Sequence, residues 1–508
     1  MSESIEFNRV SFGLPVETFR ISAHIALEER LPIVTEFVLR LLRICGQVNL
    51  ADLRDYFGFK DSEALSLIES LSRQGLITLQ DDVVRLTPYA NERFDQAGGE
   101  HPRFSKVELI QDTVIFDLCS FTPLRTQRGI SPTSNIINLD TDEEALSNSI
   151  ERARNAYRQR YPEIASMRKD LREKSHGVYS IEDIESKKRS YVPVPVTFAM
   201  DVDGQEVRRF DEEFELNAPQ ELIQFLREQI TASIPRTLTL KNHGLEEFID
   251  TFNLQVMRRY LLANKFDLTG YLNDIHIQKS VKYPKSIIPL VGNLYLSRNR
   301  ELILKRLEDR RVGRSRPRKL LTSMAWLVPD YNLWGRGDSY AATITAFNGA
   351  LRKKSATDDL HVFTPAEEGT EKYITNRFRV NGLQELHFFR TRSGDDLTMY
   401  GRLEMMLYPT AFVAALFHLS LPKVTGLWIP VGFISTLPKH LDIAHKLLCR
   451  IMGGEQYGGS AQFKVKDGAK AKVSFEAACS FLNYESLTVN SDAQEVIGVS
   501  DDDDDDES

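Results

Sequence analysis

The sequence predicts an α/β protein whose C-terminal part is a doubly wound, mostly parallel sheet. Between residues 287 and 452, short apolar runs alternate with segments long enough to form amphipathic helices. Pro, Gly, Asp or Ser bounds each run, and this alternation is typical of repeated strand–helix units. The predicted strands are Ile287–Leu296, Met324–Val328, Leu360–Phe363, Leu386–Phe389 and Leu427–Ile434.

The length of the chain indicates several domains. Its 508 residues are too many for one ordinary core, and about 150 residues per domain would give roughly three. With 42% hydrophobic and 27% charged residues, most of the chain can fold. We expect an N-terminal domain at residues 1–105, a helical and hairpin connector of α+β type at 106–280, the α/β domain at 281–490 and a disordered acidic tail at 491–508.

Net charge and cysteine content name no particular partner. The formal charge is −8, but the seven acids of Asp501–Glu507 leave the rest of the chain near −1. Cys45, Cys119, Cys449 and Cys479 form no C-x-x-C pair, so we expect buried free thiols and no zinc site. The N-terminus is polar and acidic, unlike a secretory signal, and we expect a cytoplasmic protein.

Residues 405–421 have two interpretations. These 17 residues contain no Lys, Arg, Asp or Glu, which is at the lower limit for crossing a bilayer. A helix buried in a large α/β core gives the same pattern. Pro409, His418 and the absence of a flanking basic cluster favour the buried helix, so we expect no membrane association.

Residues 31–95 predict three helices followed by a short hairpin. The first helix starts after Pro32 and ends at Gly46, and the second covers Leu50–Phe57. The third starts at Asp61 or Ser62 and ends at Gly75. Apolar residues recur at helical spacing in two of them: Ile33, Phe37, Leu41 and Ile44 in the first, and Leu65, Ile68 and Leu71 in the third.

The hairpin completes a winged helix. Its strands, Leu76–Leu79 and Val83–Thr87, flank a polar turn. The segment resembles the MarR-like winged-helix family, in which a Gly-Leu-Ile run opens the wing and a Leu-Thr-Pro run closes it. Here these runs are Gly75-Leu76-Ile77 and Leu86-Thr87-Pro88, and the resemblance covers residues 31–95.

The resemblance implies that the third helix enters the major groove of DNA while basic residues hold the phosphates. The outward positions of this helix depart from that pattern, because they include Glu63, Ser66, Glu69 and Ser70, with only Arg73 basic. Asp81 and Asp82 occupy the wing tip. Acids facing phosphates repel them, so protein docking or a homodimer through the winged helix is favoured, and DNA contact stays open.

The middle of the chain predicts a connector with a hairpin. Residues 192–216 alternate around Asp203-Gly204, a pair suited to a tight turn. Pro193 and Pro195 place the first strand at a sheet edge. Helices are expected at Pro219–Ile230 and Gly244–Asn264, and a charged, solvated helix at 143–174.

A basic cluster between residues 305 and 319 is the candidate nucleic-acid contact. Gly313 and Pro317 interrupt its helix, so the side chains would project from a loop, and the planar fork of Arg fits phosphate. An acidic partner, the aspartate tail, or no function at all remain alternatives. The candidate nucleic-acid-binding residues are Arg310, Arg311, Arg314, Arg316, Arg318 and Lys319.

The loops after the predicted strands hold the candidate ligand site, because ligands of parallel sheets bind beyond the carboxyl ends of the strands. Carboxylates there can hold Mg²⁺, and a Gly-rich turn can cradle phosphate. No phosphate-loop, dinucleotide, phospholipase D-like or nucleophile-elbow motif is present, so no catalytic residue, cofactor or metal is assigned, and His387 is interpreted as a core side chain. The candidate ligand-binding residues are Asp330, Arg336, Asp338, Arg390, Arg392 and Asp395.

These patterns predict a non-catalytic interaction subunit of a nucleic-acid-associated intracellular assembly. Bacterial genome-maintenance and phage-defence systems combine such parts, although fold alone does not fix function. Other protein subunits are the expected partners. The alternative is a nucleotide-sensing or Mg-dependent phosphoester-processing protein with its site at the carboxyl ends of the α/β strands.

Overall fold

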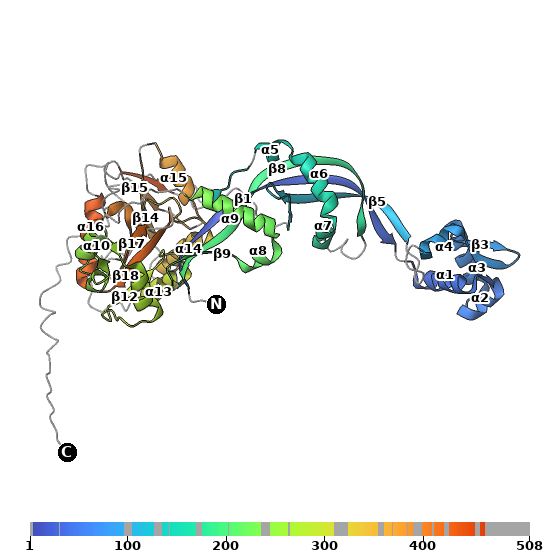
Figure 1. The fold of residues 1–508 in the computed structure, drawn as a ribbon, viewed down its shortest axis with the longest axis horizontal. Coiled ribbons are helices and arrows are strands. Elements are labelled where there is room, and N and C mark those ends of the chain that lie inside the picture. Colours follow the sequence, from blue (N-terminus) through green and yellow to red (C-terminus); the bar gives the residue numbers. More distant parts are fainter. Residues whose placement is uncertain are drawn as a thin grey trace, which may run out of the picture. The chain divides into compact units, whose positions relative to one another are not determined.

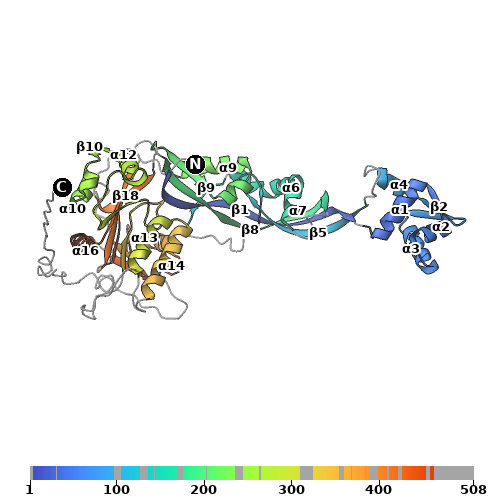
Figure 2. The same cartoon turned by 90° about the horizontal axis from the view of Figure 1, so that it is seen from below.

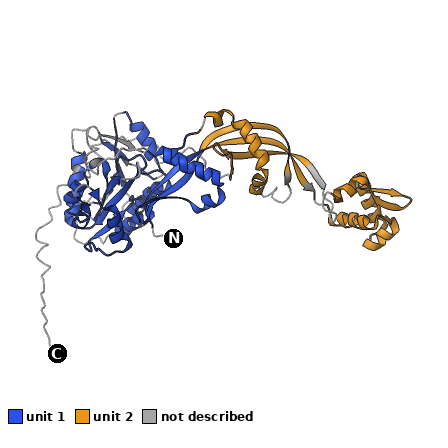
Figure 3. Cartoon of the chain, in the orientation of Figure 1, with its two compact units in different colours: residues 1–14, 131–140, 191–508 blue, residues 15–130, 141–190 orange. Residues whose placement is uncertain are grey.

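The computed structural model divides the chain into two compact units (Figures 1 and 3). Unit 1 contains residues 1–14, 131–140 and 191–508, and unit 2 contains residues 15–130 and 141–190. Both units are discontinuous in the chain, whereas the sequence predicted continuous segments. The residues described are 4–29, 31–95, 104–125, 135–141, 143–168, 175–201, 203–234, 244–262, 265–308, 324–353, 360–367, 369–380, 382–383, 385–389, 399–408, 411–420, 426–452 and 458–462.

A mixed eight-stranded sheet forms the centre of unit 1. The strand order is β12-β18-β17-β16-β13-β14-β15-β19. All five predicted strands are present. The bounds are β12 Ile287–Val291, β13 Met324–Leu327, β14 Leu360–Pro365, β15 Glu385–Phe389, β16 Leu403–Tyr408, β17 Phe412–Ser420, β18 Trp428–Ser435 and β19 Gly458–Gln462.

The prediction of a mostly parallel, doubly wound sheet is wrong. Only the β13–β14 and β14–β15 pairs of this sheet are parallel, and its other neighbours are antiparallel. The buried helix expected at 405–421 is instead the β16–β17 hairpin, in which Tyr408 pairs with Phe412. Nearly every residue of both strands is buried, so the two strands together give an unbroken apolar run that resembles a helix.

Helices lie beside this sheet and extend the core of unit 1. α13 (Ser297–Glu308) and α14 (Asp338–Arg352) pack against each other (Figure 2). No helix in the described part of the chain is long and apolar enough to span a membrane. The other α-helices described in unit 1 are α8 Glu212–Asn217, α9 Gln220–Ser233, α10 Leu245–Thr251, α11 Gln255–Arg258, α12 Leu268–Leu272, α15 Glu371–Phe378 and α16 Pro438–Met452. Two short strands, β10 Leu261–Leu262 and β11 Lys265–Phe266, pair with each other.

An aromatic cluster joins β13 to the loop that follows it. The ring of Trp326 on β13 lies 5.3 Å from that of Trp334, and Trp334 lies 5.4 Å from Tyr340 on α14. These three side chains are almost completely buried. The buried side chain of Trp334 therefore anchors the loop between β13 and α14 in the core.

Two long strands contribute residues to both units. They are β1 (Ser4–Glu29) and β8 (Ser175–Asp201), which are neighbours in a second sheet. In unit 1, β8 pairs with β9 (Glu206–Phe210) around Gly204, which confirms the predicted hairpin. β8 lies between β1 and β9, so the expected edge position is wrong. Pairing with β9 starts at Val196, directly after Pro195, so the prolines lie outside the segment paired with β9.

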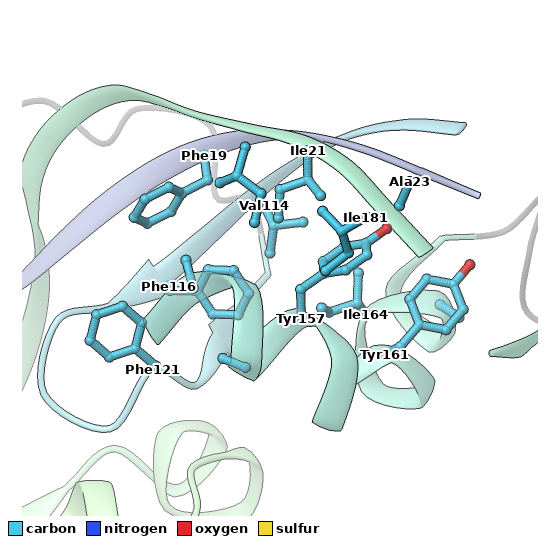
Figure 4. Close-up of a cluster of buried hydrophobic side chains, with 14 of the residues drawn as sticks. Phe19, Ile21, Ala23, Val114, Phe116, Phe121, Tyr157, Tyr161, Ile164 and Ile181 are labelled. Carbon is cyan, nitrogen blue, oxygen red and sulfur yellow. The ribbon is translucent and has the colours of Figure 1, made fainter. Parts of the chain in front are cut away.

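In unit 2, β5 (Phe104–Asp117) pairs antiparallel with β1, and helices cover the pair. The charged segment predicted as one solvated helix forms α5 Glu143–Ser147, α6 Ser149–Gln159 and α7 Tyr161–Met167. Tyr157 and Tyr161 are buried against strand residues such as Phe19 and Phe116 (Figure 4). The short strand β6 (Pro123–Leu124) pairs with β5, whereas the short strand β7 (Ile137–Asn138) pairs with the part of β1 that belongs to unit 1.

Residues 31–95, called the 31–95 module below, lie in the chain between β1 and β5. The predicted helices and hairpin are present, and a first short strand and a last helix were not foreseen. The sheet order is β2-β4-β3, and its turn holds Asp81 and Asp82 at positive φ. The elements are α1 Ile33–Cys45, β2 Gln47–Asn49, α2 Leu50–Phe57, α3 Asp61–Arg73, β3 Ile77–Gln80, β4 Val83–Leu86 and α4 Pro88–Asp95.

Candidate functional site

Helix α1 of the 31–95 module has two apolar faces. One face, with Val38 and Leu42, is buried in the core of the module. The other is exposed to solvent. We call it the α1 stripe, and its residues are Ile33, Val34, Phe37, Leu41 and Ile44, of which Ile33, Phe37 and Ile44 are 74%, 52% and 82% exposed.

The exposed face consists of the residues whose spacing predicted an amphipathic helix. Ile33, Phe37 and Ile44 fall within roughly 40° of one another at 100° per residue, so their spacing is that of an amphipathic face. The core instead uses the adjacent face. In α3 the structure likewise buries Ala64 together with the predicted Ile68, and leaves Leu65 49% exposed.

Charged residues border the α1 stripe on one flank. Arg40 lies 3.9 Å from Glu36 one turn earlier. Arg43 donates hydrogen bonds to Asn91 at 2.7 Å and to Asp95 at 2.5 Å, so it joins α1 to α4. The stripe is therefore an apolar strip with a polar rim.

Acidic side chains are exposed on α3 and at the turn of the module, together with basic ones at Lys60, Arg73 and Arg85. Glu63 and Glu69 on α3 are exposed, as are Asp81 and Asp82 in the turn. Arg54 donates to Asp61 at 2.7 Å and to Asp55 at 2.9 Å, so its charge is already matched within the module. The outward position expected for these acids is confirmed.

Cys45 and Cys119 are free thiols with different surroundings. Cys45 is exposed at the end of α1, so the expectation that it is buried is wrong. Cys119 is partly buried, and burial together with Asp117 raises the pKa of its thiol to about 12. Its thiolate is therefore strongly disfavoured at neutral pH.

The predicted nucleic-acid-binding residues and half of the predicted ligand-binding residues lie outside the described residues. They are Arg310, Arg311, Arg314, Arg316, Arg318, Lys319, Arg390, Arg392 and Asp395. Asp330, Arg336 and Asp338 are described and belong to the segment from the end of β13 to the start of α14. Arg336 is only 5% exposed, whereas Asp330 and Asp338 are exposed.

The loop between β13 and α14 is held by hydrogen bonds from several elements. Arg377 on α15 donates to the carbonyls of Tyr331 and Trp334 at 2.6 and 2.9 Å. The backbone N–H of Ser11 on β1 donates to the Arg336 carbonyl at 3.0 Å. Asn135 Nδ2 donates to the Gly337 carbonyl at 3.1 Å. The start of α14 is therefore fixed before any ligand arrives.

A cavity of about 220 Å³ lies at this helix start, within unit 1. It brings together Arg336 and Asp338, two of the predicted ligand residues, and Asp330 does not line it. It also contains Arg9 and Arg300, which the sequence reasoning missed because β1 and α13 are far from this loop in the sequence. The lining residues are Arg9, Ser11, Pro195, Arg300, Arg336, Asp338, Ser339 and Ala342.

The three arginines of the cavity differ in their partners. Arg9 forms an ion pair with Asp211 at 2.9 Å. Arg336 donates through Nη2 to Asn332 Oδ1 at 2.6 Å and to the Tyr373 hydroxyl at 3.0 Å. Arg300 is half-buried on α13, and within the described residues its side chain forms no hydrogen bond or ion pair. Its donors are therefore available.

The guanidinium charge of Arg336 shifts the pKa of two neighbouring groups. Burial and the nearby charge of Arg336 lower the pKa of the Arg377 guanidinium. At Tyr373, burial raises the pKa of the hydroxyl, but the hydrogen bond from Arg336 and the two guanidinium charges outweigh burial and lower it. The charge of Arg336 therefore acts on both of these neighbouring groups.

A buried polar pair lies inside the sheet. Glu404 on β16 accepts hydrogen bonds from the Leu294 backbone N–H at 3.1 Å and from Trp326 Nε1 at 3.3 Å. His418 Nε2 on β17 lies 3.1 Å from the other carboxylate oxygen. Both side chains are 0% exposed, so this pair supports the core and has no access to a substrate.

His387 and His440 are also packed in the core. His387 is 0% exposed and its Nε2 lies 3.1 Å from His361 Nδ1, which confirms its assignment to the core. His440 Nδ1 lies 3.0 Å from Ser435 Oγ. Among the described residues, no group of three or more His, Cys, Asp or Glu side chains is arranged to hold a metal ion.

Comparisons with known proteins assign no family. No family model matches the chain, and no curated protein matches it significantly. Among solved structures, the chain is similar to TrmBL2, described as an archaeal chromatin protein with a novel mode of DNA binding. The two are 8% identical over 83% of this chain and 92% of that one, and the TM-score is 0.17. At that score the likeness carries no argument about fold or function.

Proposed function

We propose that the protein is a non-catalytic interaction subunit of a nucleic-acid-associated assembly, in which the 31–95 module is a winged helix that pairs two copies of the chain. The exposed α1 stripe carries this proposal. An apolar strip with a polar rim on a folded surface is typical of protein–protein contact sites. Ile33 and Ile44, at its two ends, are the most exposed of its residues.

The order of elements in the module supports the winged-helix assignment. Three helices precede the β3–β4 hairpin, and β2 adds the third strand by pairing with β4. The Gly75-Leu76-Ile77 and Leu86-Thr87-Pro88 runs stand where the MarR-like pattern has them.

The acids of α3 and the turn weigh against DNA as the main partner of the module. A recognition helix needs donors aimed at phosphates and base edges, and Glu63 and Glu69 supply acceptors that repel phosphate. Arg54 is already paired with carboxylates. The α1 stripe therefore offers the stronger contact.

A second copy of the chain fits the stripe because its charges are self-complementary. Two α1 helices packed antiparallel about a two-fold axis place Ile33 of each copy near Ile44 of the other. Their flanks then meet in reverse order, so Glu36 of each copy lies near Arg40 of the other. Phe37 and Leu41 fill the centre of the contact.

Sedimentation equilibrium of the full chain tests this pairing. We expect a concentration-dependent dimer, and we expect Phe37→Glu or Ile44→Glu to give monomer, because a buried unpaired carboxylate is costly. Leu65→Glu on α3 is the matched control, since Leu65 is also an exposed apolar residue but lies off the stripe. A monomer at every concentration, or equal dissociation by Leu65→Glu, would refute the proposal.

Nucleic-acid contact by the basic cluster is tested separately. Each phosphate contact contributes about −0.9 to the slope of log affinity against log salt for duplex DNA. Replacing Arg310, Arg311, Arg314 and Arg316 with Gln should flatten that slope if the cluster contacts phosphates. An unchanged slope would remove DNA from the partners assigned to it.

A second candidate function is nucleotide sensing or Mg-dependent phosphoester processing in unit 1. The specific observation that favours it is the cavity that unites Arg336 and Asp338 at the start of α14.

A further inference from the structure

The arginine-lined cavity of unit 1 has the composition of an anion site. Its lining includes Arg9, Arg300 and Arg336, and the carboxylate there belongs to Asp338. Arg9 is offset by Asp211, but Arg300 has no such partner within the described residues. We propose that this cavity binds the phosphate group of inorganic phosphate or of a small phosphate ester. This proposal deepens the second candidate function and is independent of the α1 pairing.

The donors converge on the cavity from elements that are far apart in sequence. Arg9 comes from β1, Arg300 from α13, and Arg336 from the loop before α14. Ser11 and Ser339 add hydroxyl groups to the lining. Guanidinium groups suit phosphate because their N–H bonds match its oxygens in pairs.

The first turn of α14 adds backbone donors to these side chains. The helix has 15 residues, and no side chain caps its N-terminus. The first N–H groups of a helix lack intrahelical partners and carry partial positive charge, which favours an anion. Gly337 precedes this turn at φ 115°, and a Cβ atom there would collide with Ser11. The glycine thus permits the close approach of β1 to the helix start.

The size of the cavity selects a small ligand. Its volume of about 220 Å³ is below the roughly 300–1,000 Å³ of sites for drug-sized molecules. A phosphate group or a small phosphate ester suits a cavity of this size. A whole dinucleotide does not fit, so a nucleotide would have to extend outside.

The carboxylate of Asp338 should weaken the binding of phosphate in the cavity. Its carboxylate is exposed at the cavity and opposes an approaching dianion, although it also suits the positive helix end. Asp338→Asn should therefore tighten phosphate binding several-fold, whereas loss of a guanidinium should weaken it. Opposite effects from neighbouring lining residues are not expected from non-specific binding to a basic surface.

Isothermal titration calorimetry of the full chain with inorganic phosphate tests the proposal. We expect saturable binding that Arg300→Gln weakens by about 10-fold or more, since a charge-assisted hydrogen bond is lost. Arg298→Gln is the matched control, because Arg298 is exposed on the same helix and does not line the cavity. Circular dichroism shows whether each variant remains folded, and Arg9→Gln provides a second test from another element.

Parallel titrations identify the source of the phosphate group. Saturable binding of phosphate, with adenosine monophosphate and glycerol 3-phosphate binding no better, assigns an inorganic phosphate site and removes the nucleotide sensor. Tighter binding of either ester supports the cavity as an ester site. The proposal is overturned if no saturable binding occurs up to about 10 mM phosphate, or if Arg298→Gln weakens binding as much as Arg300→Gln does. None of these results bears on the dimer, because Phe37→Glu should bind phosphate like the parent chain.

Discussion

Ile33 and Ile44 lie at opposite ends of the same exposed face of helix α1, with 74% and 82% of their surfaces accessible. Leaving two β-branched apolar residues in water forgoes about 1.5–3 kcal/mol of burial for each side chain. The adjacent face of the same helix is fully buried by the module core. A second copy of the chain that covers the exposed face would recover that energy.

The stability of the protein should depend on glycine at position 337, just before α14, and not on glycine at position 349 within the helix. Gly337→Ala should lower the free energy of unfolding by about 1–3 kcal/mol, because φ is 115° and the added Cβ meets Ser11. Gly349 lies in the same helix with nothing within 4 Å of an added Cβ. Gly349→Ala should therefore stabilise by up to about 1 kcal/mol. Urea unfolding of both variants measures the contrast, and a shared sign would be inconsistent with this geometry.

The Glu404 carboxylate should be needed for the stability of unit 1. Glu404→Leu leaves the Leu294 and Trp326 N–H groups without their acceptor and His418 without its carboxylate partner. We expect a loss of about 3–5 kcal/mol in the free energy of unfolding, measured by urea denaturation. Glu367→Leu, at an exposed position, should change it by no more than about 0.5 kcal/mol. Similar losses in both variants would exclude a structural role for the buried pair.

Acidification should destabilise the fold partly through His387. Burial, with His361 nearby, lowers the pKa of His387 to about 3 in the folded chain. Between about pH 3 and 6.5 the unfolded chain therefore binds the extra proton, so the free energy of unfolding falls as pH falls. His387→Phe should reduce the stability lost between pH 7.5 and 5.0 by up to about 2 kcal/mol, measured by urea titrations at both values. An unchanged pH dependence would show that His387 does not titrate on unfolding.

The strands of unit 1 were predictable where polar residues separated them. Met324–Leu327 and Leu360–Pro365 are short apolar runs with clear boundaries, and both are strands. β16 and β17 were missed because strands buried on both faces lose the alternation that distinguishes them from a helix. The directions of the strands could not be predicted either. The antiparallel β16–β17 hairpin lies between β18 and β13 in the sheet, and its turn was missed.

The functional residues were predictable only where they are close in sequence. Arg336 and Asp338 were found because they follow a strand in a Gly-rich loop. Arg9 and Arg300 come from β1 and α13, which are far from that loop in the sequence, and no local pattern links them to it. The α1 stripe was visible as a periodic apolar face, but periodicity does not say which of two apolar faces the core takes.

Disulfide trapping across two α1 helices is a direct test of their antiparallel pairing. Ile33 and Cys45 are about 18 Å apart along one helix, too far for a disulfide within a chain, but antiparallel pairing brings residue 33 of one copy near Cys45 of the other. On mild oxidation, we expect Ile33→Cys to form a dimer in which mass spectrometry finds residue 33 linked to Cys45, while the parent chain forms none through Cys45. Absence of that link at concentrations where the chain self-associates, or a Cys45–Cys45 link in the parent chain, would contradict the proposed pairing.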